Sequence, residues 1–169
     1  MHFTGEGGGA SLKRYIFICI LIFSFSLFVC AEEDDLLKIE ASISPKKLSR
    51  GQEGKIVLKL VLEEGISIIP QPSFIIEFDP CKELDFPENL FALSDLEIKI
   101  LEENGEEYLD LKDPIEMPFI VRLDAKQGNH LLEGKIKYFA CSIDEGWCLK
   151  NTSKFRAVFS IRSTKFKIK

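Results

Sequence analysis

Histidine is scarce in this sequence, which limits the metal and hydrolase chemistry that it can support. The 169 residues include two histidines and five cysteines. Structural zinc sites use cysteines and histidines in closely spaced pairs, and Cys81, Cys141, Cys148 and His130 lack that spacing. A cysteine hydrolase needs a histidine beside its thiol. His130 lies at the start of an expected strand, a position that suits a surface residue better than a catalytic one. We therefore expect neither a metal site nor a cysteine hydrolase.

Clusters of basic residues and phosphate-binding glycine loops are also missing. The chain has 22 basic and 27 acidic residues, which gives a net charge of −5. Nucleic-acid binding needs clustered lysines and arginines, and the short basic tail at residues 165–169 is too small to supply them. The glycines at positions 7–9 precede an apolar run instead of opening a phosphate loop. We expect no nucleic-acid partner.

The one long apolar run lies near the N-terminus. Lys13 and Arg14 precede the uncharged residues 15–29, and acidic residues follow at 32–35. The run is too short to span a bilayer comfortably, and Val29-Cys30-Ala31 places small or branched side chains where a signal peptidase reads. The sequence therefore predicts a signal peptide over residues 1–31, cleaved after Ala31, and an exported mature domain over residues 32–169.

Two other interpretations of this segment stay open. The sequence before Cys30 is similar to a lipobox, which would acylate Cys30 and tether the protein to a membrane, although Val29 stands where a small residue is expected. The run could also act as an uncleaved anchor. Each interpretation places the domain in the periplasm or outside the cell.

Apolar residues recur with period two through most of the remaining sequence, which is typical of half-buried strands. The segments with this pattern are residues 37–43, 56–62, 74–78, 117–123, 132–140 and 155–161. Turn residues separate them, and no long segment has a helical period. The pattern predicts one all-β domain, an immunoglobulin-like antiparallel β-sandwich, which we expect to be a monomer. Asn104-Gly105, inside the acidic stretch 102–107, suits a tight hairpin turn.

Three cysteines remain after the expected leader. Cys141 and Cys148 flank a turn between two expected strands, so a hairpin would bring them within disulfide range. In an oxidising compartment such a pair is normally bonded. The bond could be a clip that staples the hairpin, worth about 2–3 kcal/mol, or a redox pair that exchanges electrons with another protein. Cys81 is expected to be a buried or partly buried free thiol.

The sequence around this pair resembles the N-terminal periplasmic domain of the thiol:disulfide interchange protein DsbD. The resemblance rests on Tyr138-Phe139-Ala140-Cys141, the acidic turn that follows, Cys148, and Pro118 in an upstream strand. It is best over residues 107–161. The chain departs from the family in its longer turn between the cysteines and in Leu149-Lys150-Asn151, where the family has prolines.

The resemblance implies an immunoglobulin-like fold and thiol–disulfide exchange. Cys148 would attack the partner's disulfide and Cys141 would resolve the mixed disulfide. No bound cofactor would be needed, because the disulfide is itself the redox group. Reducing equivalents would come from a membrane electron donor and pass to thioredoxin-like or other disulfide-bearing exported proteins.

The resemblance also implies a cap loop that shields the cysteines, for which Glu106, Glu107 and Tyr108 are the candidates; a plain acidic hairpin turn is the alternative. Trp147 would either pack over the disulfide, contribute to docking, or close the end of the core.

Carboxylates near a thiol raise its pKa, so Asp144 and Glu145 would make the thiol of Cys148 less reactive outside a docked complex. A solvated turn is the other interpretation of these two acids.

A function of a different class also remains open. The protein could be a non-catalytic envelope binding module, in which the disulfide is purely structural.

Overall fold

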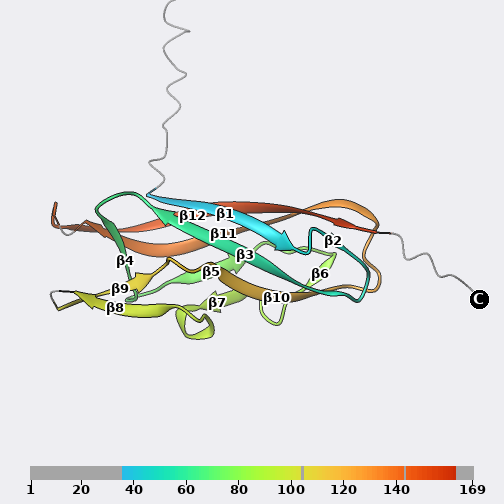
Figure 1. Cartoon of the computed structure of the whole chain (residues 1–169), viewed down its shortest axis with the longest axis horizontal. Helices are drawn as coiled ribbons and strands as arrows, with labels where there is room; N and C mark the ends of the chain where they lie inside the picture. Colours follow the sequence, from blue (N-terminus) through green and yellow to red (C-terminus); the bar gives the residue numbers. More distant parts are fainter. Residues whose placement is uncertain (1–35, 104, 143, 163–169) are drawn as a thin grey trace, which may run out of the picture. The chain divides into compact units, whose positions relative to one another are not determined.

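Alternating buried and exposed side chains organise the domain as strands (Figure 1). The computed structural model describes residues 36–103, 105–142 and 144–162. The expected signal peptide at residues 1–31, with its alternative lipid site Cys30, and the basic tail at residues 165–169 lie outside the described residues. No helix in the described part of the chain is long and apolar enough to cross a membrane.

The elements in chain order are β1 (Leu37–Ser44), β2 (Lys47–Leu48), β3 (Glu53–Leu62), β4 (Ile66–Ile69), β5 (Ile75–Phe78), β6 (Leu84–Asp85), β7 (Leu90–Ala92), the 3₁₀ helix η2 (Leu93–Asp95), β8 (Lys99–Glu103), β9 (Glu106–Asp110), β10 (Ile115–Val121), β11 (Gly128–Ser142) and β12 (Trp147–Ile161).

The strands form two main sheets and a separate hairpin. One sheet has the order β1-β3-β10-β6, and the other has the order β2-β12-β11-β5-β7, with β4 also paired to β11. In immunoglobulin domains strands A, B, E and D form one sheet and C, F and G the other. Here β1, β3, β10 and β6 take the first set of places and β5, β11 and β12 the second. The fold is an immunoglobulin-like β-sandwich, as the alternation of the sequence predicts.

The longest pairing joins β11 and β12, which run antiparallel from Gly128 opposite Ile161 to Ser142 opposite Trp147. Every second residue of β12 from Phe155 onward is buried, and so is every second residue of β11 from Leu132 to Ala140. Because side chains alternate between the two faces of a strand, the residues between them point away from the core. This register decides which side of the hairpin carries the cysteines.

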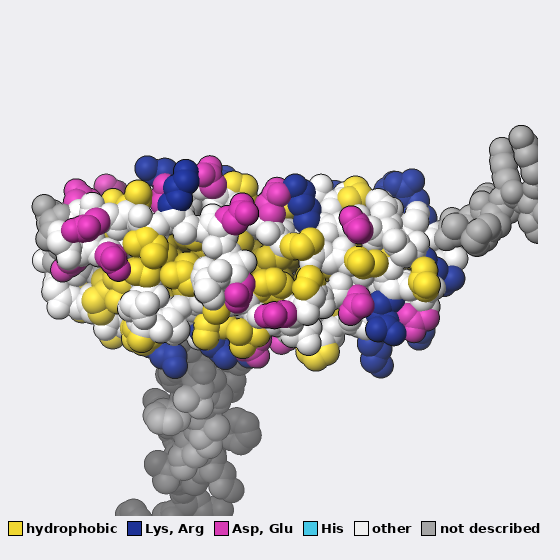
Figure 2. Space-filling model, turned by 90° about the horizontal axis from the view of Figure 1, so that it is seen from below, with side chains coloured by type: hydrophobic (Ala, Val, Ile, Leu, Met, Phe, Trp, Pro, Cys, Tyr) yellow, Lys and Arg dark blue, Asp and Glu magenta, His cyan; other side chains and the backbone are white. Residues whose placement is uncertain are grey.

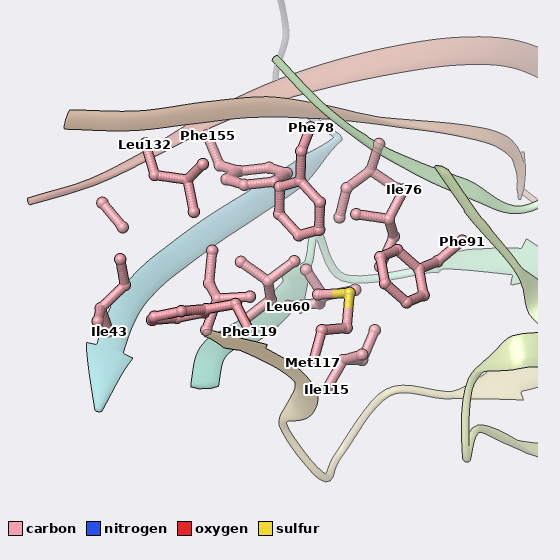
Figure 3. Close-up of a cluster of buried hydrophobic side chains, with 14 of the residues drawn as sticks. Ile43, Leu60, Ile76, Phe78, Phe91, Ile115, Met117, Phe119, Leu132 and Phe155 are labelled. Atoms are coloured by element: carbon pink, nitrogen blue, oxygen red, sulfur yellow. The ribbon is translucent and has the colours of Figure 1, made fainter. Parts of the chain in front are cut away.

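The core fills the space between the two sheets (Figure 3). Ile43, Leu60 and Phe119 come from the first sheet, and Phe78 and Phe155 come from the second. The rings of Phe78 and Phe155 meet edge to face, with their centroids 5.8 Å apart. Such pairs add a directional contact to the burial of apolar area that stabilises the sandwich.

The strand that pairs with β11 on the side away from β12 is divided into two pieces, β4 and β5. Ile69 of β4 pairs with Phe139 and Ile75 of β5 pairs with Lys137, so residues 70–74 all lie opposite Tyr138 alone. Pro70 and Pro72 have no N–H group to donate to a sheet, which ends regular pairing here. The extra residues leave the sheet beside the end of β11.

The expected hairpin between residues 103 and 106 is confirmed, because Glu103 of β8 pairs with Glu106 of β9 and Gly105 has a φ of 83°. Asn104 itself lies outside the described residues. The extension of the alternating pattern to Leu123 is wrong. β10 ends at Val121 and Leu123 is 79% exposed, since the chain turns there toward β11.

Gly134 marks the tightest point between β11 and its neighbours. A Cβ atom at this position would lie 2.5 Å from a ring carbon of Phe155 and 2.7 Å from the carbonyl oxygen of Glu77. We expect Gly134→Ala to lower the free energy of unfolding by about 1–3 kcal/mol, because overpacking forces neighbours out of place. Urea unfolding followed by the fluorescence of Trp147 measures this.

The matched control is Glu133→Ala, at an exposed position of the same strand. It should change the free energy of unfolding by less than about 0.5 kcal/mol. A Gly134→Ala protein as stable as the unchanged protein would show that the contact with Phe155 is not a constraint.

Candidate functional site

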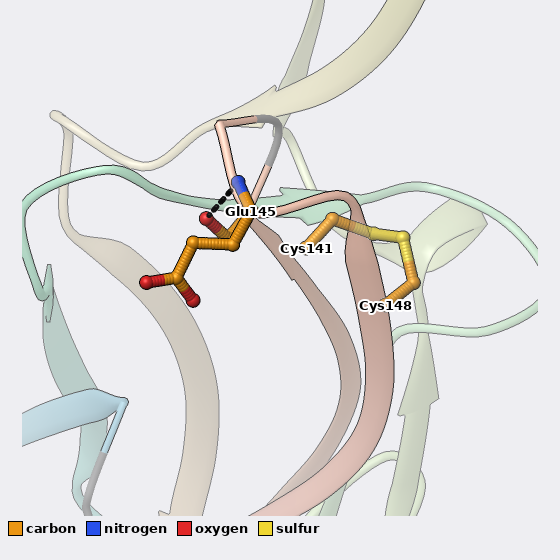
Figure 4. The surroundings of a disulfide bond; sticks show 4 residues. Cys141, Glu145 and Cys148 are labelled. Atoms are coloured by element: carbon orange, nitrogen blue, oxygen red, sulfur yellow. Dashed lines mark hydrogen bonds between the residues drawn. A yellow bond between two sulfur atoms is a disulfide. The ribbon is translucent and has the colours of Figure 1, made fainter.

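The cysteines Cys141 and Cys148 form a disulfide across the end of the β11–β12 hairpin (Figure 4). They are directly opposite one another in the register, with an S–S distance of 2.04 Å and a Cα–Cα distance of 4.1 Å. The disulfide that the sequence predicts is therefore present. The bond joins two strands that are already paired, so its position follows from the hairpin register.

The two cysteines differ in their exposure to solvent. Cys148 is exposed, whereas Cys141 is only 5% exposed. Cys141 follows the buried Ala140 and so lies on the outward side of its strand, where a side chain would ordinarily be open to water. Neighbouring segments must therefore cover it. A reagent approaching from solvent meets Cys148 first.

A pocket of about 280 Å³ lies beside the disulfide, and its lining shows which segments provide the cover. The lining residues are Ile69, Pro70, Gln71, Glu106, Glu107, Cys141 and Cys148. Ile69 ends β4, two residues come from the break between β4 and β5, and two come from the start of β9. Two segments distant in sequence from the cysteines therefore surround the bond.

Glu106 and Glu107, the candidate cap residues, thus lie at the disulfide. Tyr108 is half-buried, pairs with Leu101 across the β8–β9 hairpin, and is absent from the pocket lining. The carboxylates of Glu106 and Glu107 are exposed and give this pocket a negative rim. Negative charge next to a thiol disfavours its thiolate.

The acids of the turn itself are placed differently. Asp144 and Glu145 are exposed, and Figure 4 shows the Glu145 side chain directed away from the disulfide. The Glu145 carboxylate accepts a hydrogen bond from the indole N–H of Trp147, and its backbone N–H donates to the Ser142 hydroxyl at 3.4 Å. Glu145 therefore organises the turn, and the acids that line the disulfide pocket are those of β9.

Two aromatic residues singled out from the sequence face the interior. Tyr138 is fully buried in the core, where its hydroxyl lies 3.0 Å from the hydroxyl of Ser153. Trp147 is half-buried and packs against the same core. Neither lines the disulfide pocket. Strand alternation explains both positions. Tyr138 lies three residues before Cys141 in β11, and Trp147 lies one residue before Cys148 in β12, so each points to the face opposite to that of the cysteine in its strand.

The third cysteine, Cys81, is a half-buried free thiol in the loop between β5 and β6, as the sequence predicts. Its sulfur lies 3.8 Å from a carboxylate oxygen of Glu83. His130 Nδ1 lies 3.7 Å from the same side chain, and its Nε2 lies 2.8 Å from the carbonyl of Lys126. Among the described residues no group of three or more histidine, cysteine, aspartate or glutamate side chains could hold a metal.

No family model and no curated protein match the chain. Solved structures with a similar arrangement include the seventh ScaB type I cohesin from Pseudobacteroides cellulosolvens, at 11% identity and a TM-score of 0.41, covering 75% of this chain and 93% of that one. The cohesin module of a Clostridium perfringens family 33 glycoside hydrolase has 12% identity and a TM-score of 0.37, covering 75% and 95%.

A third similar structure is AggA, the major subunit of aggregative adherence fimbriae type I from Escherichia coli, at 6% identity and a TM-score of 0.37, covering 75% of this chain and 95% of that one. At these identities and TM-scores the likeness carries no argument about function. The fold assignment rests on the strand order given above.

The environment of Cys81 leads to a test of its ionisation. Burial, the largest effect, raises the pKa of the Cys81 thiol. Because the thiolate is the nucleophile, we expect iodoacetamide to alkylate Cys81 more slowly at pH 8 than it alkylates a cysteine in an unstructured peptide. The pH at which the alkylation rate of Cys81 rises should be higher than the pH at which the rate of the peptide cysteine rises. Mass spectrometry of the oxidised protein over a pH series measures both.

Unfolding in guanidinium chloride is the control, since it removes the burial and should restore the ordinary pH profile. If the alkylation rate of folded Cys81 rises at the same pH as that of the peptide cysteine, or at a lower pH, the thiol is not in the buried environment described.

Proposed function

We propose that this protein is an exported thiol–disulfide exchange component that carries reducing equivalents through Cys141 and Cys148. The observation that carries the proposal is the unequal exposure of the two cysteines beside a pocket. One cysteine is open to a partner and the other is covered by segments from elsewhere in the chain. A bond that only stapled the hairpin would need neither feature.

The proposed reaction is an exchange between the protein and the disulfide of a partner. The thiolate of Cys148 attacks one partner sulfur, and the partner's other sulfur leaves with the electron pair and takes a proton. The thiolate of Cys141 then attacks the sulfur of Cys148, which releases the partner's second thiol. The partner is reduced by two electrons, and the Cys141–Cys148 disulfide is formed again.

The location of Glu106 and Glu107 also supports the proposal. In the DsbD resemblance these residues belong to a cap over the cysteines, and they line the pocket beside the bond. The resemblance places the partners in the periplasm: a membrane electron donor upstream, and thioredoxin-like or other disulfide-bearing proteins downstream. Re-reduction by the donor would return the pair to its dithiol form.

A second candidate function is a non-catalytic immunoglobulin-like envelope binding module with a structural disulfide. It requires nothing beyond the sandwich, the bond and a binding surface, all of which the protein has. A groove of about 670 Å³ supplies such a surface on the sheet that lacks the cysteines, lined in part by Pro45, Phe86, Pro118 and Ile120. Figure 2 shows hydrophobic side chains gathered on one face of the domain among acidic ones.

Single-cysteine variants test the proposed exchange. Cys141→Ser keeps only the exposed thiol of the pair, and Cys148→Ser keeps only the covered one. The probe is a thioredoxin that retains one active-site cysteine, activated as its mixed disulfide with 5-thio-2-nitrobenzoate. Because reaction requires access to the attacking sulfur, Cys141→Ser should join to the probe at least about tenfold faster than Cys148→Ser.

The reduced protein with both cysteines should release the probe thiol and recover its own disulfide, as mass spectrometry can establish. A Cys81→Ser variant is the control and should behave as the unchanged protein does. Equal rates for the two single-cysteine variants, or a mixed disulfide that is never resolved, would contradict the proposal.

A further inference from the structure

The outward side of β12 carries a row of basic residues that begins beside the exposed cysteine. Cys148, Lys150, Lys154 and Arg156 are all exposed, and they share one face because they are separated by even numbers of residues. We call these four residues the hairpin face. At about 3.4 Å per residue, the face extends over about 27 Å, which suits the footprint of a small protein partner.

The basic side chains of the hairpin face are not held in ion pairs. Among the described residues Lys150, Lys154 and Arg156 form no ion pair. Glu133 lies opposite Arg156 in the register but is not within ion-pair distance.

Four other basic side chains on the two sheets are paired. Lys135 and Lys137 of β11 both contact Glu77, at 3.2 and 2.7 Å. On the opposite sheet Lys59 lies 3.8 Å from Glu40, and Lys55 pairs with Glu116. What distinguishes the hairpin face is that its three unpaired basic residues follow one strand face from the exposed cysteine.

Apolar side chains lie at both ends of the basic row. Near the disulfide, Phe139 stands opposite Lys150 on β12 and opposite Ile69 on β4. At the far end, Leu131 and Val158 face each other across the strands, 46% and 65% exposed. A charged centre with apolar contacts at its ends can both orient a partner and hold it.

We infer that the hairpin face docks an acidic surface of the disulfide-bearing partner protein, so that the partner's disulfide meets Cys148. The inference rests on the proposed function and adds that the partner's docking surface is acidic. Charge complementarity carries it: the unpaired basic residues lie on the same strand face as the exposed sulfur. The acids Glu106 and Glu107 line the pocket beside the disulfide, whereas the basic residues follow β12 away from it, so the charges around the bond favour one orientation of the partner.

Three peptide disulfides test the inference with the reduced protein. Each peptide has nine residues and one cysteine, bonded to 5-thio-2-nitrobenzoate, and carries either three glutamates, three glutamines or three lysines. Cys148 attacks the peptide sulfur and expels the coloured thiolate, and Cys141 then displaces the peptide thiol. The release of colour gives a second-order rate constant for each peptide.

We expect the glutamate peptide to react about tenfold faster than the lysine peptide at low ionic strength. The difference should vanish in 1 M salt, where the screening length is about 3 Å. The net charge of the chain predicts the opposite order, so a preference for the acidic peptide can only come from a local surface.

The variant Lys150→Glu with Lys154→Glu should remove the preference, since it reverses the face. Its matched control, Lys38→Glu with Lys59→Glu, makes the same change in net charge at exposed positions on β1 and β3 of the other sheet and should keep the preference. Thermal unfolding of both variants checks that they remain folded.

The outcomes separate the inference from the function beneath it. Exchange at equal rates with all three peptides would overturn the docking face and leave the exchange reaction standing, whereas an absence of exchange would overturn both. Equal rates together with binding to vesicles of phosphatidylglycerol and phosphatidylcholine, lost in Lys150→Glu with Lys154→Glu, would reassign the face to a membrane surface and overturn the inference.

Discussion

The antiparallel register of β11 and β12 is the constraint on which the other features of this domain depend. Side chains in a strand alternate with a period of two, so a slip of one residue would exchange every inward side chain for an outward one. The native register puts Tyr138 and Phe155 in the core and sets Cys141 against Cys148. The same register places the exposed sulfur and the basic residues of the hairpin face on one surface. Core packing and the proposed chemistry are therefore fixed by a single alignment of two strands.

The covering of Cys141 has a separate origin, in the interruption of the neighbouring strand. Pro70 and Pro72 end the pairing of β4 with β11, and the residues between β4 and β5 reach the disulfide pocket. The β8–β9 hairpin contributes Glu106 and Glu107 to the lining of the same pocket. The disulfide is thus set in a regular hairpin but enclosed by irregular or separate segments. Both segments are anchored in the core of the sandwich, through Phe74 and Leu109.

The sequence was informative wherever a local pattern determined the structure. Alternation predicted the long strands, Asn104-Gly105 predicted a two-residue turn, and the spacing of Cys141 and Cys148 predicted their bond. Short strands such as β6 and β7 escaped notice because two or three residues are too few for a period to appear. Leu123 was assigned to a strand because a hydrophobic residue in phase with β10 looks the same in sequence whether or not the strand continues.

The surroundings of the disulfide were harder to predict, because they depend on contacts between distant segments. The acids nearest in sequence, Asp144 and Glu145, belong to the exposed turn, and Glu145 is bonded to Trp147. Glu106 lines the pocket although it is far from either cysteine in sequence, and only the DsbD resemblance pointed to it. The parity of Trp147 in β12 would have indicated an inward position, had the start of that strand been known.

The central claim is that Cys141 and Cys148 exchange electrons in use, and the reduction potential of the pair tests it most directly. The purified protein is equilibrated in glutathione buffers, and mass spectrometry counts the cysteines that change state. The account predicts a two-electron couple between roughly −120 and −270 mV, the range of thiol–disulfide exchange proteins, with Cys81 unchanged. A pair that stays oxidised below about −300 mV would contradict it, and the bond would then be a structural clip in a binding module.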